Sequence, residues 1–526
     1  MAQRNCSQDI HWIFLGRILL LIFSVLQIFR WRITPQFLDI YYHLLTAWGF
    51  NQAGGYTGWD FWQYAPFGRM HIYPPFFHIL LGAFMKIGFD KLLLIRICET
   101  ASPILALFTV HYFVKKHYSP RLAFFALLVA VSSFSFYMNL MNRIPSALAI
   151  IIGLLAYDQL LEGKILRTVL LLSLSFYTHI GVSWFFSLGL LFYGFFNKER
   201  MKFCLSIACL TLIISCPVIV KQILTVNAVE RTGFQLTKTL RSQYKIFEYL
   251  LVFPGLFFSF KGPKKYRLSA ALFFASLIFV IYPYRFFSGE GFLPVVFLAA
   301  IGLDGLYKNF FEKKNFFIRS SAVAFISVYF FFISPTILNK NPLIRARSDV
   351  QFRLFFSHTA FMGMAFPEDI SRGFYDFIFF CYDAPVFIET ANLIKEYTHK
   401  EDIIFSNVNL LGVIVASLSG RPTSNALFPE IGPSQGFDPI SSSNVILFTK
   451  DEDLTWTESV IEKYGLVKFS ENKIFNFYNH PEAREKARFG RASIPFWAIG
   501  LIALLFIFLY STDNKSIVRN FLKVHS

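Results

Sequence analysis

The chain has 526 residues, of which 55% are hydrophobic and only 16% charged, and its mean hydropathy is +0.49. These values exclude an ordinary soluble globular protein and are typical of a helical membrane protein with many spans. A net charge of +17 would indicate nucleic acid binding in a soluble protein, but membrane proteins concentrate Lys and Arg in cytoplasmic loops. We therefore expect an integral, multi-pass protein of a prokaryotic cell membrane rather than of the endoplasmic reticulum, with no nucleic acid partner.

Familiar cofactor and hydrolase motifs are missing from the sequence. It contains no Gly-rich phosphate loop, no His-Glu-x-x-His and no Gly-x-Ser-x-Gly. The six cysteines show no Cys-x-x-Cys spacing and lie mostly in apolar runs, which favours neither a metal site nor a disulfide framework. ATP use and the familiar hydrolase reactions therefore have no support in these motifs.

Apolar runs long enough to cross a membrane begin with 11–29, which lacks a small-residue cleavage site and is expected to be an uncleaved anchor. The predicted spans are 11–29, 92–114, 121–141, 145–161, 165–177, 181–196, 203–222, 246–260, 268–284, 290–307, 317–337 and 493–511.

Basic clusters fall at every second gap between these spans. They are Lys115/Lys116/Arg121, Lys164/Arg167, Lys198/Arg200/Lys202, Lys261/Lys264/Lys265/Arg267, Lys308/Lys313/Lys314/Arg319 and Lys515/Arg519/Lys523. If all six are cytoplasmic, the chain has about twelve spans with both termini inside. Arg30, Arg32 and the basic residues between 231 and 245 then lie outside, against this trend.

The same count makes 30–91 one long extracytoplasmic loop. Its apolar segment 76–88 is too short to cross, since a span takes about 20 residues. We expect it to form a helix that lies on the membrane or dips into it. For 165–177 and 181–196 we expect a hairpin broken at 178–181, because a single tilted helix would put the flanking basic clusters on opposite sides.

The sequence predicts three parts: a membrane domain over 1–337, an extracytoplasmic domain over 338–492, and a last span with a cytoplasmic tail over 493–526. In the second part, alternating patterns predict a small α/β domain. Its predicted elements are helices 385–397, 410–419 and 454–464 and strands 402–406, 445–448, 466–469 and 474–478.

The first loop concentrates side chains that could do chemistry. Asp39 and His43 are four residues apart, so on a helix they share a face and could address one substrate or ion. Asp60, Arg69 and His71 lie in or near a Pro- and Gly-rich turn that would present them rigidly. The alternatives are that Asp39 caps a helix with His43 solvated, and that the turn is purely structural.

Two arginines and a histidine are expected at the same membrane face. Arg143 lies in a very short outer connection and Arg285 at another outer end, where guanidinium groups could grip a lipid phosphate. His179, at the break of the predicted hairpin, could contribute to the same site. Snorkelling of the arginines to headgroups and a structural role for His179 are the alternatives.

An Asp shortly after the first span, a long aromatic outer loop and the turn Tyr64-Ala65-Pro66-Phe67-Gly68-Arg69 resemble the GT-C superfamily of membrane glycosyltransferases. The catalytic subunit of oligosaccharyltransferase is the most similar in appearance over about the first 300 residues, and again weakly over Ile388–Asn425. The resemblance implies transfer of a sugar from a polyprenyl-phosphate-linked donor to a protein, lipid or glycan acceptor on the outer or lumenal face. Asp39 matches the first-loop carboxylate that engages the acceptor or a metal, and Arg143 and Arg285 match arginines near the donor phosphate.

The sequence also departs from that pattern. Residues 142–148 contain none of the acidic metal ligands that follow the third span in oligosaccharyltransferases, and 406–412 replaces their Trp-Trp-Asp-Tyr-Gly motif. The resemblance therefore implies a relative that does not modify asparagine. Mg²⁺ or Mn²⁺ at Asp39 stays open. The competing interpretations are a lipid or glycan transporter or flippase, and a non-catalytic assembly protein with a GT-C-like fold.

Overall fold

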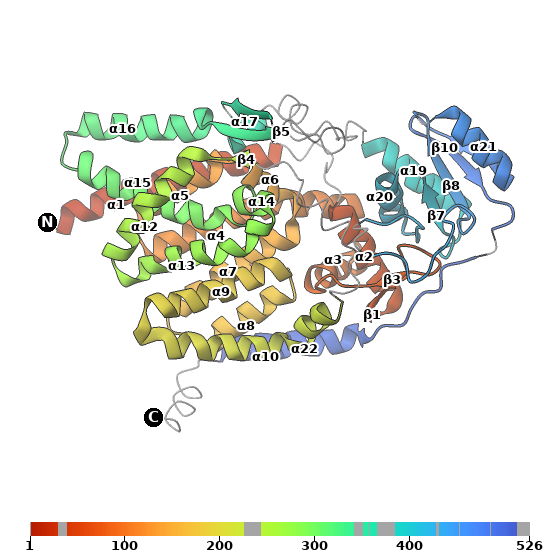
Figure 1. The fold of residues 1–526 in the computed structure, drawn as a ribbon, viewed down its shortest axis with the longest axis horizontal. Helices are drawn as coiled ribbons and strands as arrows, with labels where there is room; N and C mark the ends of the chain where they lie inside the picture. Colours follow the sequence, from red (N-terminus) through yellow and green to blue (C-terminus); the bar gives the residue numbers. More distant parts are fainter. Residues whose placement is uncertain are drawn as a thin grey trace, which may run out of the picture.

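The structure is a computed structural model that describes residues 2–29, 39–225, 243–340, 351–356, 358–365, 384–427, 431–451, 453–483 and 485–512. Figure 1 shows an elongated body of nearly parallel helices and, at one end of it, a smaller unit built around a sheet. The first-loop helices α2 and α3 lie between the two parts.

The helical body is built from apolar helices of very different lengths. They are α1 (Ala2–Phe29), α4 (Lys91–His117), α5 (Pro120–Ser132), α6 (Phe134–Asn142), α7 (Ile144–Leu161), α8 (Ile165–Phe176), α9 (Ile180–Phe196), α10 (Met201–Thr225), α12 (Ile246–Lys261), α13 (Arg267–Ala275), α14 (Pro283–Phe287), α15 (Phe292–Phe310), α16 (Phe316–Val328) and α22 (Phe496–Ser511). Within the described residues, six helices are long and apolar enough to cross a membrane, or seven if the bent pair α5–α6 is one span. The predicted count of twelve is not confirmed by this criterion.

Two predicted spans are not continuous α-helices. The run 121–141 is bent by 85° between α5 and α6, because Ser133 is extended and its side chain accepts a hydrogen bond from the Phe136 amide. The run 268–284 changes from α13 into a 3₁₀ segment, Ser276–Ile281, and ends before Pro283, which opens α14. Proline has no N–H to donate, so it starts a helix more readily than it continues one. Each of these two predicted spans is therefore interrupted within its length.

The predicted hairpin and the predicted short helix of the first loop are both present. The hairpin around 178–181 is present as α8 and α9, and the extended His179 caps α9 by accepting the Val182 amide at 3.2 Å through Nδ1. The short apolar segment of the first loop forms α3 (Phe76–Lys86), only 11 residues long.

Burial ranks the helices from the centre of the body to its edge. Every residue of α5 from Leu122 to Ser132 is buried, as is the first half of α15. No residue of α16 or α22 is buried. Helices α12 and α15 touch backbone to backbone, since a Cβ added to Gly255 would lie 2.0 Å from the Leu298 carbonyl oxygen. Small residues commonly allow such close approach between membrane helices.

The turns that carry basic clusters meet at one end of the body, which we call the basic end. At this end Arg167, at the start of α8, donates to the Tyr510 carbonyl oxygen near the end of α22 at 2.9 Å. The cluster after residue 512 lies outside the described residues. Three ion pairs join the other turns: Lys116–Asp158 at 2.7 Å, Lys264–Glu199 at 2.5 Å and Arg121–Asp304 at 2.6 Å.

The smaller unit contains a four-stranded sheet in the order β7-β8-β10-β9, in which only the β7–β8 pair is parallel. Each predicted element between 385 and 478 has a counterpart here, while the domain boundaries at 337/338 and 492/493 stay predictions. The elements are β7 (Ile404–Ser406), β8 (Val445–Thr449), β9 (Val467–Glu471), β10 (Phe475–Asn479), α19 (Ala384–Tyr397), α20 (Asn409–Ser419) and α21 (Leu454–Tyr464).

The first loop joins this unit to the helical body. Helix α2 (Asp39–Ala53) packs against both α3 and α20, and is buried from Ile40 to Phe50. Strand β1 (Gly55–Tyr56) pairs with β11 (Ile494–Pro495) just before α22. Two further strands, β2 (Trp59–Asp60) and β3 (Arg69–Met70), form a hairpin. A separate sheet of β4 (Gln243–Tyr244), β5 (Thr336–Lys340) and β6 (Gln351–Phe355) lies beside the body with α17 (Ala360–Ala365) and the π-helical turn Tyr329–Ile333.

The arrangement predicts that the basic end and the first loop face opposite sides of the membrane. In a background without native cysteines, cysteines at Gly58 and Gly436 should react with an impermeant maleimide from outside intact cells, whereas Lys313→Cys should react only after permeabilisation. A Cβ at either glycine meets no atom within 4 Å, so neither substitution is strained by contact. Labelling of Lys313→Cys but not of Gly58→Cys from outside would contradict this topology.

Candidate active site

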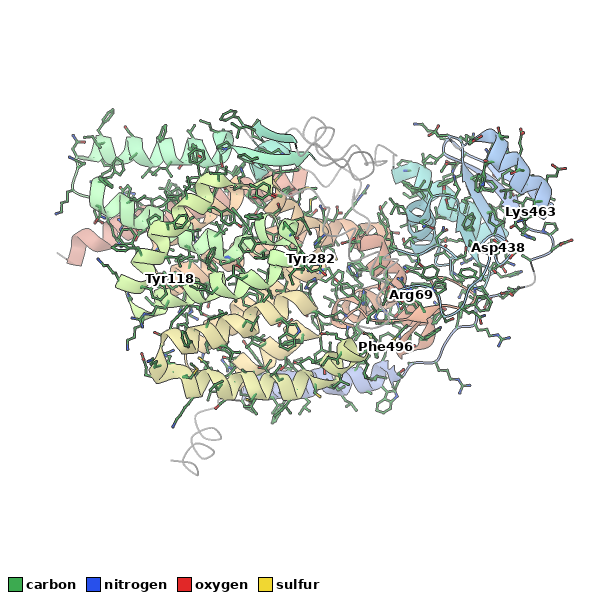
Figure 2. All side chains as sticks on the ribbon, in the orientation of Figure 1. Arg69, Tyr118, Tyr282, Asp438, Lys463 and Phe496 are labelled. Atoms are coloured by element: carbon green, nitrogen blue, oxygen red, sulfur yellow. The ribbon has the colours of Figure 1, made fainter. Side chains whose placement is uncertain are left out.

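Two arginines approach each other at the end of the body opposite the basic end. Arg143 joins α6 to α7, and α7 runs from there to the basic turn that follows Leu161. Arg285 lies in α14, shortly before α15, which also runs to the basic end. Figure 2 shows this geometry through its labelled side chains, with Tyr118 near the basic end and Tyr282 at the end that faces the first loop.

A buried carboxylate organises these arginines. Glu290 is 0% exposed, and its Oε1 lies 3.6 Å from Arg285 Nη1 and accepts a hydrogen bond from Ser146 Oγ at 2.8 Å. Arg143 and His179 are also within electrostatic reach of this carboxylate. The predicted site did not include Glu290. The sequence could have pointed to Glu290, because it is a lone acidic residue at the start of a predicted span, where a charge without a partner is costly.

The guanidinium of Arg143 is held by an aromatic ring. Its Cζ lies 4.3 Å from the centre of the Tyr284 ring, a favourable cation–π arrangement. Arg143 Nη1 and the Tyr284 hydroxyl are buried and have no hydrogen-bond partner among the described residues. The cation therefore keeps donor capacity that a ligand could use.

Tyr73 connects this cluster to the first loop. Its ring centre lies 4.9 Å from that of His43 and 6.3 Å from that of His179. Asp39, the half-buried first residue of α2, is within electrostatic reach of Tyr73 and of Arg143. Burial raises the pKa of the Tyr73 hydroxyl above its ordinary value, so Tyr73 keeps its proton. Tyr73, like Glu290, was missing from the predicted set.

One interpretation of the sequence placed His43 in solvent, but the side chain is buried. Its Nδ1 lies 2.8 Å from His78 Nε2, and burial lowers the pKa of His43 to about 3. The imidazole is therefore neutral near pH 7, so His43 offers no positive charge to a phosphate. It packs against Tyr73 and supports it. The structure thus groups His43 with Asp39, Arg143, His179 and Arg285.

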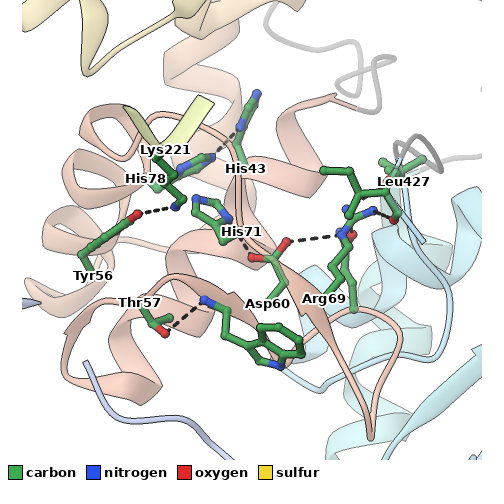
Figure 3. A network of polar contacts seen from close by, with 12 residues as sticks. His43, Tyr56, Thr57, Asp60, Arg69, His71, His78, Lys221 and Leu427 are labelled. Atoms are coloured by element: carbon green, nitrogen blue, oxygen red, sulfur yellow. Dashed lines mark hydrogen bonds and ion pairs between the residues drawn. The ribbon is translucent and has the colours of Figure 1, made fainter. Parts of the chain in front are cut away.

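Asp60, Arg69 and His71 form a separate buried network (Figure 3). Asp60 contacts His71 Nδ1 at 2.7 Å through Oδ1 and Arg69 Nε at 3.4 Å through Oδ2. Arg69 also donates to the carbonyl oxygens of Leu427 at 2.8 Å and Ile431 at 3.0 Å, so the network ties the first loop to the sheet unit.

The same region also reaches the helical body. Lys221 of α10 donates a hydrogen bond to the Tyr56 hydroxyl, next to the ring of His71 (Figure 3). Asp60, Arg69 and His71 are each at most 4% exposed, so they do not line an open surface.

The residues at the site do not fit a divalent metal. The part of the chain that the structure describes holds no group of three or more His, Cys, Asp or Glu side chains placed to bind a metal ion. Mg²⁺ requires near-octahedral oxygen coordination. Here the two carboxylates of Asp39 and Glu290 share the site with two guanidinium groups. We therefore place no metal ion among these residues.

Comparison with solved structures identifies the fold. No protein-family model matches the chain, and no curated protein matches its sequence. The structure is similar to the Archaeoglobus fulgidus oligosaccharyltransferase AglB solved in complex with an inhibitory peptide and a dolichol-phosphate, at TM-score 0.53 and 11% identity, covering 89% of this chain and 74% of AglB. The same enzyme tethered to an acceptor peptide with an NVT sequon gives TM-score 0.54 and 12% identity, covering 85% and 68%.

A second relative in structure is ArnT from Cupriavidus metallidurans. Its apo state gives TM-score 0.53 at 11% identity, covering 90% of this chain and 99% of ArnT, and ArnT has also been solved bound to undecaprenyl phosphate. The chain therefore has the fold of the GT-C membrane glycosyltransferases, which confirms the resemblance found in the sequence. It is an integral membrane protein of mainly helical structure.

The Asp60 network predicts a large stability effect for one substitution. Arg69→Met should lower the free energy of unfolding by about 3–5 kcal/mol, because it leaves a buried carboxylate without its cation. Thermal and denaturant unfolding of the purified protein in detergent measure the effect. Glu471→Gln is the matched control, since it removes an exposed pair with Lys468, and because water screens such a pair the variant should lose far less stability than Arg69→Met. Equal losses in the two variants would contradict a supporting role for the network.

Proposed function

We propose that this protein is a glycosyltransferase that moves a sugar from a polyprenyl-phosphate-linked donor to an acceptor on the outer or lumenal face of the membrane. The observation that carries the proposal is the convergence of Asp39, Arg143 and Arg285 at one end of a GT-C fold. It is supported by the phosphate lipids bound by AglB and ArnT, which have this fold. The acceptor is a protein, a lipid or a glycan.

The proposed topology has twelve passes, with 30–91 and 338–492 on the side of the candidate site. This topology is supported by the positions of the basic turns at one end of the helical body and of Arg143 and Arg285 at the other end. Shorter apolar helices such as α8, α9 and α22 would then complete the count beyond the six long helices. The domains proposed are 1–337 and 338–492, followed by 493–526 with the last span.

Each residue of the site has its own role in the proposed reaction. Asp39 accepts the proton of the acceptor hydroxyl as the oxygen forms its bond to the anomeric carbon of the sugar. The bond from that carbon to the phosphate oxygen breaks, and the lipid phosphate leaves with both electrons. Arg143 and Arg285 stabilise the charge that develops on the leaving oxygen. Glu290, His179 and Tyr73 position these groups.

The proposal predicts that Asp39→Asn abolishes sugar transfer. Loss of a general base costs about 10²–10⁴-fold in rate. The assay is release of undecaprenyl phosphate from defined undecaprenyl-phosphate-linked sugars by purified protein. Asp90→Asn is the matched control: this first-loop carboxylate caps α4 by accepting the Leu93 amide at 2.9 Å, and asparagine caps equally well. Retention of more than about a tenth of the activity by Asp39→Asn would exclude Asp39 as the base.

We expect substitutions of Arg285 to weaken binding of the lipid-linked donor. Arg285→Lys keeps the charge but loses the two-pronged guanidinium, so donor affinity should fall, and Arg285→Ala should lower it by about tenfold or more, since one charge-assisted hydrogen bond contributes about 1.5–3 kcal/mol. Titration of the donor measures this. Arg491→Ala, at an exposed arginine just before α22, is the control for contact with bulk headgroups and should leave donor affinity unchanged. Unchanged donor affinity in Arg285→Ala would remove Arg285 from the site.

The same assay separates the competing interpretations. A transporter or flippase would move the intact lipid-linked sugar across a bilayer without releasing lipid phosphate. A non-catalytic assembly protein would do neither. Either result with the wild-type protein would overturn the proposed transferase.

A further inference from the structure

The short helix α6, which follows the bend after α5, carries two buried side-chain amides. Asn139 is 5% exposed and Asn142 is 3% exposed. Both amide atoms of Asn139 and the Oδ1 of Asn142 have no hydrogen-bond partner within the described part of the chain. Buried amides are normally satisfied, because an unpaired one has lost its hydration without compensation. Two such groups on one short helix therefore indicate a missing partner.

These amides lie next to the ionic cluster of the candidate site. A Cβ added to Gly289 would approach Asn139 Oδ1 to 3.4 Å, which places that side chain beside the residue preceding Glu290. Asn142 directly precedes Arg143. The second carboxylate oxygen of Glu290, Oε2, is likewise buried and has no partner among the described residues. Asn139 therefore lies close to the backbone of Arg285, whose Cα the same Cβ would approach to 3.1 Å, and we call the region of Asn139, Asn142 and Glu290 Oε2 the flank of the two guanidinium groups.

The bend between α5 and α6 is consistent with a ligand at this flank. The chain bends by 85° at Ser133, where three serines (132, 133 and 135) interrupt an otherwise apolar run. Irregular backbone at membrane depth is tolerated where it is packed in protein or lines a polar cavity.

The chemistry of this flank differs from that of the guanidinium groups. Amides both donate and accept hydrogen bonds, and Glu290 Oε2 accepts them. None of the three supplies a positive charge, and the carboxylate would repel a phosphate. Sugar hydroxyls, in contrast, both donate and accept. Because the sugar of the donor is bonded to its phosphate, a sugar whose phosphate lies on Arg143 and Arg285 must lie immediately beside them.

We propose that Asn139 and Asn142, together with Oε2 of Glu290, form the subsite that hydrogen-bonds the hydroxyl groups of the donor sugar. This inference rests on the proposed function. It assigns discrimination between sugars to α6, since a site built to pair with hydroxyl groups rejects analogues that leave its own polar groups unpaired.

The test compares two ligands on one nearly isosteric variant, Asn139→Leu, in nanodiscs. The probes are undecaprenyl phosphate and undecaprenyl-phosphate-linked glucose or mannose, whichever binds the wild-type protein more tightly. The variant should bind the sugar-linked lipid at least tenfold more weakly and undecaprenyl phosphate within twofold of wild type. Its unfolding temperature without ligand should not fall, because the substitution removes unpaired polar atoms.

Thr211→Val is the matched control, because the hydroxyl of Thr211, in the middle of α10, is also buried and has no partner among the described residues. It should change neither affinity. Asn142→Leu gives an independent variant if Asn139→Leu does not fold. A lower unfolding temperature, equal weakening of both lipids, or unchanged binding of the sugar-linked lipid would overturn the subsite. Failure of the wild-type protein to bind undecaprenyl phosphate would instead overturn the proposed function.

Discussion

The buried carboxylate of Glu290 is the constraint around which the candidate site is built. A carboxylate that is 0% exposed in an apolar helical body is stable only with charged and hydrogen-bonding partners. Arg285 and Ser146 supply them at 3.6 Å and 2.8 Å, from two segments far apart in the sequence. These contacts fix how the α6–α7 connection meets the segment before α15. Because Glu290 does not use all the N–H groups of Arg143, this guanidinium can still donate hydrogen bonds to an anionic lipid headgroup.

Asp39 is positioned by a different part of the molecule. Helix α2, which it opens, is packed between α3 and α20, and Lys91 Nζ donates to the Ser417 carbonyl oxygen of α20 at 2.8 Å. Arg69 fastens the same loop to the Leu427 carbonyl oxygen. The sheet unit therefore supports the first loop, and through it the carboxylate proposed as the base. This explains how residues remote from the chemistry could affect the orientation of Asp39.

The sequence was informative where a property is local. The break at 178–181 and the short helix over 76–88 follow from interrupted or insufficient apolar length, and the alternation of basic clusters placed Arg143 and Arg285 at one end. The bend at Ser133 was missed because the serines at 132, 133 and 135 interrupt an apolar run without giving a periodic signal. Glu290 was missed because Ser146, its hydrogen-bond partner, lies 144 positions away, and Tyr73 was missed because the ring of His179 that it contacts comes from another segment. For the same reason, the ties between Arg69 and the backbone near residue 430, more than 350 positions away, could not be predicted.

The central claim is that Arg143 and Arg285 hold the phosphate of a polyprenyl carrier. The most direct measurement is an electron cryo-microscopy structure of the full chain in nanodiscs with undecaprenyl phosphate. The account predicts headgroup density within hydrogen-bonding distance of both guanidinium groups, at the end of the body that faces Asp39. A headgroup bound at the basic end, with the ionic cluster around Glu290 empty of ligand, would contradict it.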